Sequence, residues 1–195
     1  TTTSATSLTC TLPNDAVSGT VTLKLKDADA GHPPGTKTSA AFGVKGVLTF
    51  SSTPSGTITV GDQPTITWSK TGNIPTVDLF YKVGAGADTL IGGGLTGTSL
   101  TWTVPEGAIG TSVTLKLKDA DASHPLTETT SAAFGVKGSL QIADPAALLT
   151  VGTAENLTWT KTATITSVDL FYSTDGSTWA TITTASPPHI PRRQA

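Results

Sequence analysis

A ten-residue stretch that occurs twice constrains this chain more than any other feature. The letters VTLKLKDADA stand at residues 21–30 and again at residues 113–122, so the copies are 92 residues apart (113 − 21 = 92). A His-Pro pair follows each copy, and the letters SAAFGVKG of residues 39–46 return unchanged at 131–138. A repeat of this length is too long for one turn of a solenoid and fits an array of small domains. The 195 residues therefore hold about two repeat units.

The intact copy, residues 47–138, has the pattern of a series of short β-strands. Apolar and polar residues alternate, β-branched and aromatic residues are frequent, and Gly, Pro, Asn or Asp bound each run, whereas helical spacing is missing. The expected strands are 47–50, 57–60, 65–68, 77–81, 99–104, 113–118 and 133–136. Along 113–118, Val and Leu face one side while Thr and Lys face the other, as in a half-buried antiparallel strand. About seven strands in about ninety residues predict an all-β, immunoglobulin-like β-sandwich.

The chain has one cysteine, Cys10, so no internal disulfide can hold the sandwich together. Large side chains on the strands must therefore fill its core. The expected core residues are Trp68, Trp102, Trp159, Phe80, Phe171, Leu115 and Leu117.

Several of these strand patterns resemble a known type of domain. The motifs are GDQPTITW at 61–68, VDLFY at 77–81, LTWTVP at 100–105, VTLKLKD at 113–119 and AFGV at 133–136. They are similar to tandem immunoglobulin-like or fibronectin-III-like repeats of bacterial and archaeal surface proteins, and also to the Ser/Thr-rich cell-wall family of fungi. The resemblance covers nearly the whole chain and implies a fold and an extracellular setting. Because the motifs are core-packing positions, it implies no catalytic residues, and we expect no enzymatic activity.

The two ends of the chain correspond to different parts of the repeat. Residues 1–46 match the second half of the intact copy, and residues 139–185 match the first half. For example, VDLFY at 77–81 returns at 168–172, at a spacing of 91 (168 − 77 = 91). We therefore expect repeats of about 92 residues in the order half, whole, half, followed by a Pro-rich tail at 186–195.

An isolated half of a sandwich would leave an apolar face open and strand edges unpaired. We expect the first half in one copy to be completed by residues 1–46 of the next copy, head to tail, which gives an extracellular fibre. The expected core of this composite joint is Leu8, Cys10, Leu12, Trp159 and Trp179. Cys10 stands where the intact copy has Trp102, and a gapped alignment brings Trp179 near Leu90, so volume would be conserved across the joint.

Two other readings stay open at this point. The chain could be an excerpt of a longer surface-protein array that acts as a spacer or an adhesin. It could instead be a carbohydrate-binding module, with Tyr81, Tyr172 and Trp179 as the candidate aromatic platform.

Composition limits the partners and the location. The net charge is −2 and only 13% of residues are charged, with no Lys/Arg cluster beyond Arg192-Arg193, which argues against nucleic acid. Apolar runs are far too short for a membrane span. Thr makes up roughly a fifth of the chain and Met is missing, a composition that we take as typical of a secreted or cell-surface protein.

Few residues suggest chemistry. Asp27 and Asp29 before His32, and Asp119 and Asp121 before His124, could hold calcium through carboxylate oxygens, although a strand-end turn explains the same letters and is what we expect. Gly92–Gly94 is expected to be a hairpin or loop, because no phosphate-binding loop or nucleophile elbow is present. Asn156 begins a formal N-glycosylation sequon.

Overall fold

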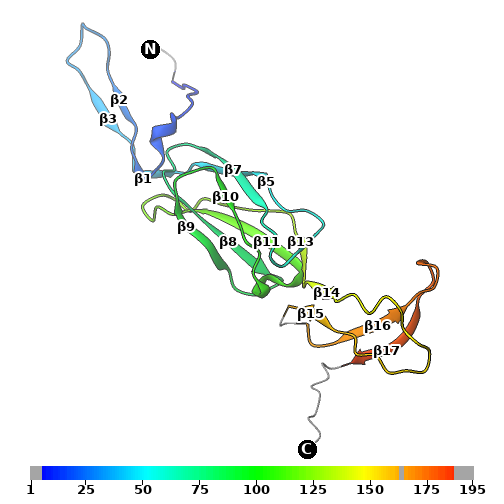
Figure 1. The fold of residues 1–195 in the computed structure, drawn as a ribbon. Helices are drawn as coiled ribbons and strands as arrows, with labels where there is room; N and C mark the ends of the chain where they lie inside the picture. Colours follow the sequence, from blue (N-terminus) through cyan, green and yellow to red (C-terminus); the bar gives the residue numbers. More distant parts are fainter. Residues whose placement is uncertain (1–5, 163–164, 187–195) are drawn as a thin grey trace, which may run out of the picture.

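The computed structural model describes residues 6–162 and 165–186. Three parts follow one another along an elongated molecule: an N-terminal segment (6–46), a central body (47–138) and a C-terminal segment (139–162 and 165–186) (Figure 1). The regular elements of the described residues are β-strands, apart from two short 3-10 helices. Within the described ranges, no helix has the length and apolarity needed to cross a membrane.

The central body consists of two sheets. One sheet has the order β10-β7-β5, and the other has the order β6-β13-β11-β8-β9 with β12 paired to β11. All pairs are antiparallel except β6 with β13. The elements are β5 Val47–Ser52, β6 Thr57–Thr59, β7 Thr65–Thr71, β8 Val77–Val83, β9 Thr89–Leu95, β10 Ser99–Thr101, η2 Glu106–Ala108, β11 Gly110–Asp119, β12 Glu128–Thr130 and β13 Phe134–Lys137.

One apolar core unites the two sheets. On β11, Val113, Leu115 and Leu117 are fully buried while the residues between them face outward, as their alternation predicts. They share a cluster with Trp68 of β7 and with Trp102, which follows β10. Both tryptophans, which the sequence places in the core, are almost completely buried.

The two end segments contain only two-stranded pairs, in contrast to the central body. In the described ranges, β1 pairs with β4, β2 with β3, β14 with β15 and β16 with β17. The N-terminal elements are η1 Asn14–Ala16, β1 Ser18–Val21, β2 Lys24–Lys26, β3 Thr36–Thr38 and β4 Phe42–Val44. The C-terminal elements are β14 Leu140–Ile142, β15 Trp159–Lys161, β16 Val168–Tyr172 and β17 Ala180–Ser186.

These pairs repeat the registers of the central body at the spacings found in the sequence. Ser18 lies opposite Val44, as Gly110 lies opposite Val136, and both pairs of strands then shift register. In the C-terminal segment, β16 pairs with β17 in the register of β8 with β9, including the irregular positions. Strand β11 is continuous, whereas its N-terminal counterpart is divided into β1 and β2.

Two core predictions are wrong, because the face of one strand was misjudged. On β8, Val77, Leu79 and Tyr81 are buried, so Phe80 points to the opposite face and lies outside the core cluster. Its counterpart Phe171 on β16 is likewise exposed. Asp78 lies on the same face as Phe80, so the alternation along 77–81 was the signal that the prediction missed.

The glycine run 92–94, expected in a hairpin or loop, lies in strand β9, which forms an antiparallel hairpin with β8. This strand lies at the edge of its sheet and pairs irregularly with β8. Gly94 has a φ of +62°, and its N–H donates to Oδ1 of Asp78 at 2.8 Å. Glycine permits this conformation, so the run forms an irregular edge strand.

The gapped alignment of Trp179 with Leu90 is wrong as well. Phe80 lies opposite Leu90, and Phe171 lies opposite Thr181, so the counterpart of Leu90 is Thr181. Trp179 therefore corresponds to Asp88 at the spacing of 91. The proposed exchange of volume between Trp179 and Leu90 has no basis in the structure.

Candidate functional site

The end segments expose large apolar side chains that soluble domains normally bury. Leu25 on β2 is 78% exposed, and Tyr172 on β16 is 53% exposed. Other exposed members of this set are Leu8, Leu12, Leu23, Leu140, Ile142, Leu148, Leu149 and Val151. The exposed apolar positions thus occur in both segments rather than in one.

Many of these side chains have a buried counterpart in the central body. Leu25 corresponds to Leu117, which is 0% exposed, and Leu23 corresponds to the fully buried Leu115. At the C-terminal end, Tyr172 corresponds to Tyr81, which is 9% exposed. The exposed apolar residues of both segments therefore match residues of the one buried core of the central body.

The strand pairing shows the same division. In the central body, β11 pairs with β8 along seven registered positions, from Val113 opposite Val83 to Asp119 opposite Val77. Among the described strands, β1 and β2 have no counterpart of β8, and β16 has no counterpart of β11. Each segment therefore has, among its described strands, an unpaired edge whose counterpart is paired in the central body.

The residues expected in a composite core divide between these open faces. Leu8, Cys10 and Leu12 are all exposed, and Trp159 on β15 is half-buried. The counterpart of Cys10 is Trp102, whose ring lies 5.5 Å from that of Tyr81 and 6.4 Å from that of Phe134, centroid to centroid. Their meeting in a joint stays a prediction. Trp179 is exposed too.

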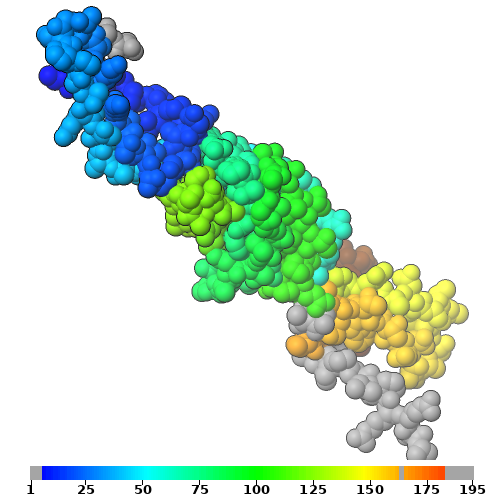
Figure 2. Space-filling model, turned by 90° about the vertical axis from the view of Figure 1, so that its left-hand side faces the viewer, coloured from blue at the N-terminus to red at the C-terminus, as the bar shows by residue number. Residues whose placement is uncertain are grey.

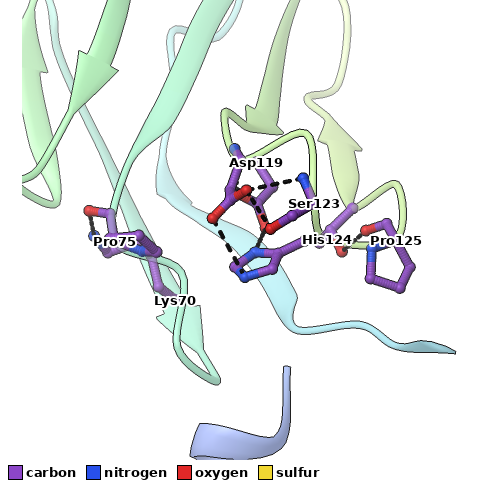
Figure 3. Close-up of polar contacts among 8 residues, drawn as sticks. Lys70, Pro75, Asp119, Ser123, His124 and Pro125 are labelled. Atoms are coloured by element: carbon purple, nitrogen blue, oxygen red, sulfur yellow. Dashed lines mark hydrogen bonds and ion pairs between the residues drawn. The ribbon is translucent and has the colours of Figure 1, made fainter. Parts of the chain in front are cut away.

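The two Asp-x-Asp loops differ in their surroundings. In the central body, His124 Nδ1 lies 2.8 Å from Oδ2 of Asp119, and the two side chains are 8% and 2% exposed (Figure 3). Oδ1 of Asp119 accepts the N–H of Asp121. Ser123 donates both its hydroxyl and its N–H to Asp121 and thereby lowers the pKa of that carboxyl. The expected turn is present, but its first carboxylate is buried rather than solvated.

The N-terminal loop has the same residues in an open form. His32 is 66% exposed, and its Nδ1 lies 3.7 Å from Asp27 and 3.6 Å from Asp29. Across the described part of the chain, no group of three or more His, Cys, Asp or Glu side chains is arranged to hold a metal ion. The calcium site stays an untested possibility that this geometry does not support.

The loop at residues 123–125 also forms a contact that the sequence did not suggest. The N–H of Gly19 on β1 donates to the carbonyl of Ser123 at 3.1 Å. A Cβ built at Gly43 on β4 would lie 2.9 Å from Cγ of Pro125, so strand and loop touch closely. Figure 2 shows the yellow-green loop against the blue N-terminal segment. The sequence feature that could have pointed to this contact is the His-Pro pair, which occurs in both loops.

The remaining candidates are on the surface or in the core, not in a common site. Tyr81 is buried, so it cannot belong to an aromatic platform with Tyr172 and Trp179. Asn156 is exposed just before β15. In the turn before β17, the carboxylate of Asp175 accepts the N–H groups of Thr178 and Ser177, which holds its pKa well below the usual range.

Comparison with models of protein families, with curated proteins and with solved structures gives no match.

Proposed function

We propose that this protein is a structural subunit of an extracellular fibre and polymerises head to tail by completing a split sandwich. The C-terminal segment of one copy, residues 139–185, supplies the first strands. Residues 1–46 of the next copy supply the remaining ones. The central body is a complete immunoglobulin-like repeat, and each joint forms a second one.

One observation carries this proposal: apolar side chains exposed in both segments correspond to side chains buried in the central body. Leu25 and Tyr172 lie on opposite sides of the expected joint, and their counterparts Leu117 and Tyr81 share the same core. Exposing this surface is unfavourable by roughly 25 cal/mol per Å² of apolar area, so joining the halves is driven by the same effect that folds the central body.

The free strand edges support the same pairing. In the composite joint, β1 and β2 would lie along β16 as β11 lies along β8, which supplies main-chain hydrogen bonds in addition to apolar contact. An interface of this kind resembles a domain core cut in two. Such obligate interfaces bury roughly 2,000 Å² or more.

The direct test is the size of the purified 195-residue chain. We expect end-to-end polymers in electron micrographs and a broad, concentration-dependent distribution in sedimentation velocity. Removal of residues 1–46 deletes one side of every joint and should leave a monomer. Addition of the isolated 1–46 segment to the full chain should occupy open C-terminal ends and shorten the polymers.

A pair of single substitutions isolates the apolar contact. Leu25→Asp places a charge where the joint is expected to close, so it should prevent polymerisation. Lys26→Gln, at the adjacent exposed position whose counterpart Lys118 is also exposed, should leave polymers intact. If Leu25→Asp polymerises as the unaltered chain does, the joint is not the one proposed.

A further inference from the structure

We infer that the joint has a second contact: the loop at residues 31–33 of one copy docks into a hollow on the central body of the preceding copy. This inference rests on the proposed head-to-tail assembly and names a surface outside the composite sandwich. The hollow lies at the C-terminal end of the central body and is lined in part by Ile109, Thr111 and Gly135.

The chain itself contains the precedent for this contact. Loop 123–125 of the central body is seated on β1 and β4 of the N-terminal segment, at Gly19 and Gly43. By the spacing of 92, the counterparts of these two glycines are Thr111 and Gly135, both in the hollow. The counterpart of the loop is Gly31-His32-Pro33. Related surfaces therefore occur twice, once in contact within the chain and once apart; the second carries Thr111 in place of Gly19 and has Thr57 of β6 beside Gly135.

The link between successive parts is also repeated, which places the second pair of surfaces in the same relation. A Cβ at Gly46 would lie 2.6 Å from Cδ1 of Ile74, and a Cβ at Gly138 would lie 2.7 Å from Cδ1 of Ile165. The glycine at each junction thus packs against an equivalent isoleucine of the following part. A next copy that completes the C-terminal segment would bring its loop 31–33 to the hollow.

The two contacts differ at one position on the receiving strand, where Thr111 stands in place of Gly19. Within the chain, Gly19 faces Ser123; between copies, Thr111 would face Gly31. A Cβ at Gly19 would approach the carbonyl oxygen of Ser123 to 2.7 Å, so Thr111 requires the opposing loop to shift. A glycine at position 31 provides that backbone freedom.

The loop is free to make this contact. It joins β2 to β3 in a hairpin that projects from the rest of the molecule (Figure 1). His32 is largely exposed, and its distances to Asp27 and Asp29 exceed that of the buried His124–Asp119 pair. Docking would surround this loop as loop 123–125 is surrounded. Thr57 lines one side of the hollow, with its Oγ1 3.0 Å from a Cβ built at Gly135, and the described part of the N-terminal segment has no residue in the equivalent place.

Engineered disulfides test the contact directly. A Cβ at Gly43 would lie 3.7 Å from Cβ of Pro125, within the range that disulfides span. In a Cys10→Ser background, Gly43→Cys with Pro125→Cys should therefore close within one chain. The matched pair Gly135→Cys with Pro33→Cys should instead link successive copies and give a ladder of multiples on a non-reducing denaturing gel.

Two controls separate the outcomes. Gly97→Cys with Pro33→Cys places the first cysteine in an open position near Ser99, remote from the hollow, and should give no ladder. Sedimentation velocity of the same samples reports polymerisation independently. Polymers that form without a ladder from the Gly135→Cys and Pro33→Cys pair, while the intrachain pair closes, overturn this inference and leave the proposed joint standing. A chain that stays monomeric overturns both.

Discussion

His124 Nδ1 lies 2.8 Å from Oδ2 of Asp119, and both side chains are almost completely shielded from water. The corresponding residues Asp27 and His32 stand 3.7 Å apart in a largely exposed loop. One sequence pattern therefore exists in a buried and an open form within one molecule. The difference arises from what surrounds each loop, since the two loops share their Asp, His and Pro residues.

Replacement of His124 by Ala should destabilise the central body. The substitution leaves the buried Asp119 carboxylate without its side-chain partner, and an unsatisfied buried group of this kind costs about 1–3 kcal/mol. His32→Ala, the matched change in the open loop, should alter the stability of the single chain by less than about 0.5 kcal/mol. Urea unfolding at concentrations that keep the chain monomeric measures both. Equal losses from the two variants would contradict the contrast between the loops.

Trp102→Ala should cost roughly 3–5 kcal/mol of unfolding free energy, as other large core truncations do. The ring is buried and touches Tyr81 and Phe134, so its removal leaves a cavity between the two sheets. Thermal or chemical unfolding of the variant measures the loss. A decrease below about 1 kcal/mol would show that the core closes around the missing ring.

The alternation of apolar residues was sufficient to predict most strands of the central body. A period of two places Leu115 and Leu117 on one face without any knowledge of their neighbours, and the structure confirms this. The same rule, applied to the whole of 77–81, places Phe80 on the face of Asp78 and Tyr81 on the face of Val77 and Leu79, so the sequence held the signal that the core prediction missed. The register with β11, which sets Leu115 opposite Tyr81, agrees with the burial of Tyr81.

The loop contacts were beyond the sequence for a different reason. The hydrogen bond from the N–H of Gly19 to the carbonyl of Ser123 joins residues far apart in the chain. Because both groups belong to the backbone, the identities of the two side chains do not predict the contact. The burial of Asp119 likewise depends on tertiary surroundings, so the letters alone suggested a solvated turn. The repeat does show that loop 31–33 recurs as loop 123–125 and that Gly43 recurs as Gly135. This recurrence is the signal that leads to the second contact.

Chelation of divalent cations should leave the melting temperature of the protein unchanged. Bound calcium would stabilise the folded state by ligand linkage, so its removal would lower the midpoint. The Asp119 and Asp121 carboxylates already accept hydrogen bonds within their own loop, which is the physical reason to expect no effect. Calorimetric scans with EDTA and with added calcium measure the shift. A shift of many degrees that calcium reverses would restore the metal site.

Cys10 should react rapidly with a thiol reagent in the monomer and slowly in the polymer. Its side chain is exposed in the single chain, whereas its counterpart Trp102 is buried. Completion of the sandwich should place Cys10 in the equivalent interior position and shield it. Labelling that is quenched at successive times and read by mass spectrometry gives the two rates. One sample is kept below, and the other above, the protein concentration at which polymers form. Equal rates would mean that Cys10 lies outside the joint.

Residues 47–138, prepared alone, should fold into a stable monomer. This fragment contains both sheets, the complete core cluster and the buried Asp119–His124 pair, so the principal contacts of the central body are internal to it. It lacks the exposed apolar faces of the end segments, and it loses Val17, which lies against Gly72, and the hydrogen bond from Asn73 N–H to the carbonyl of Asn14. These losses lie at one end and should lower stability without removing cooperativity.

We expect one unfolding transition with the same midpoint by far-UV circular dichroism and by tryptophan fluorescence, and a single monomeric species in sedimentation velocity. Because the full chain should polymerise under the same conditions, the comparison assigns polymerisation to the end segments. A fragment that is unfolded or self-associating would show that the central body depends on its neighbours, and the division into half, whole and half would have to be abandoned.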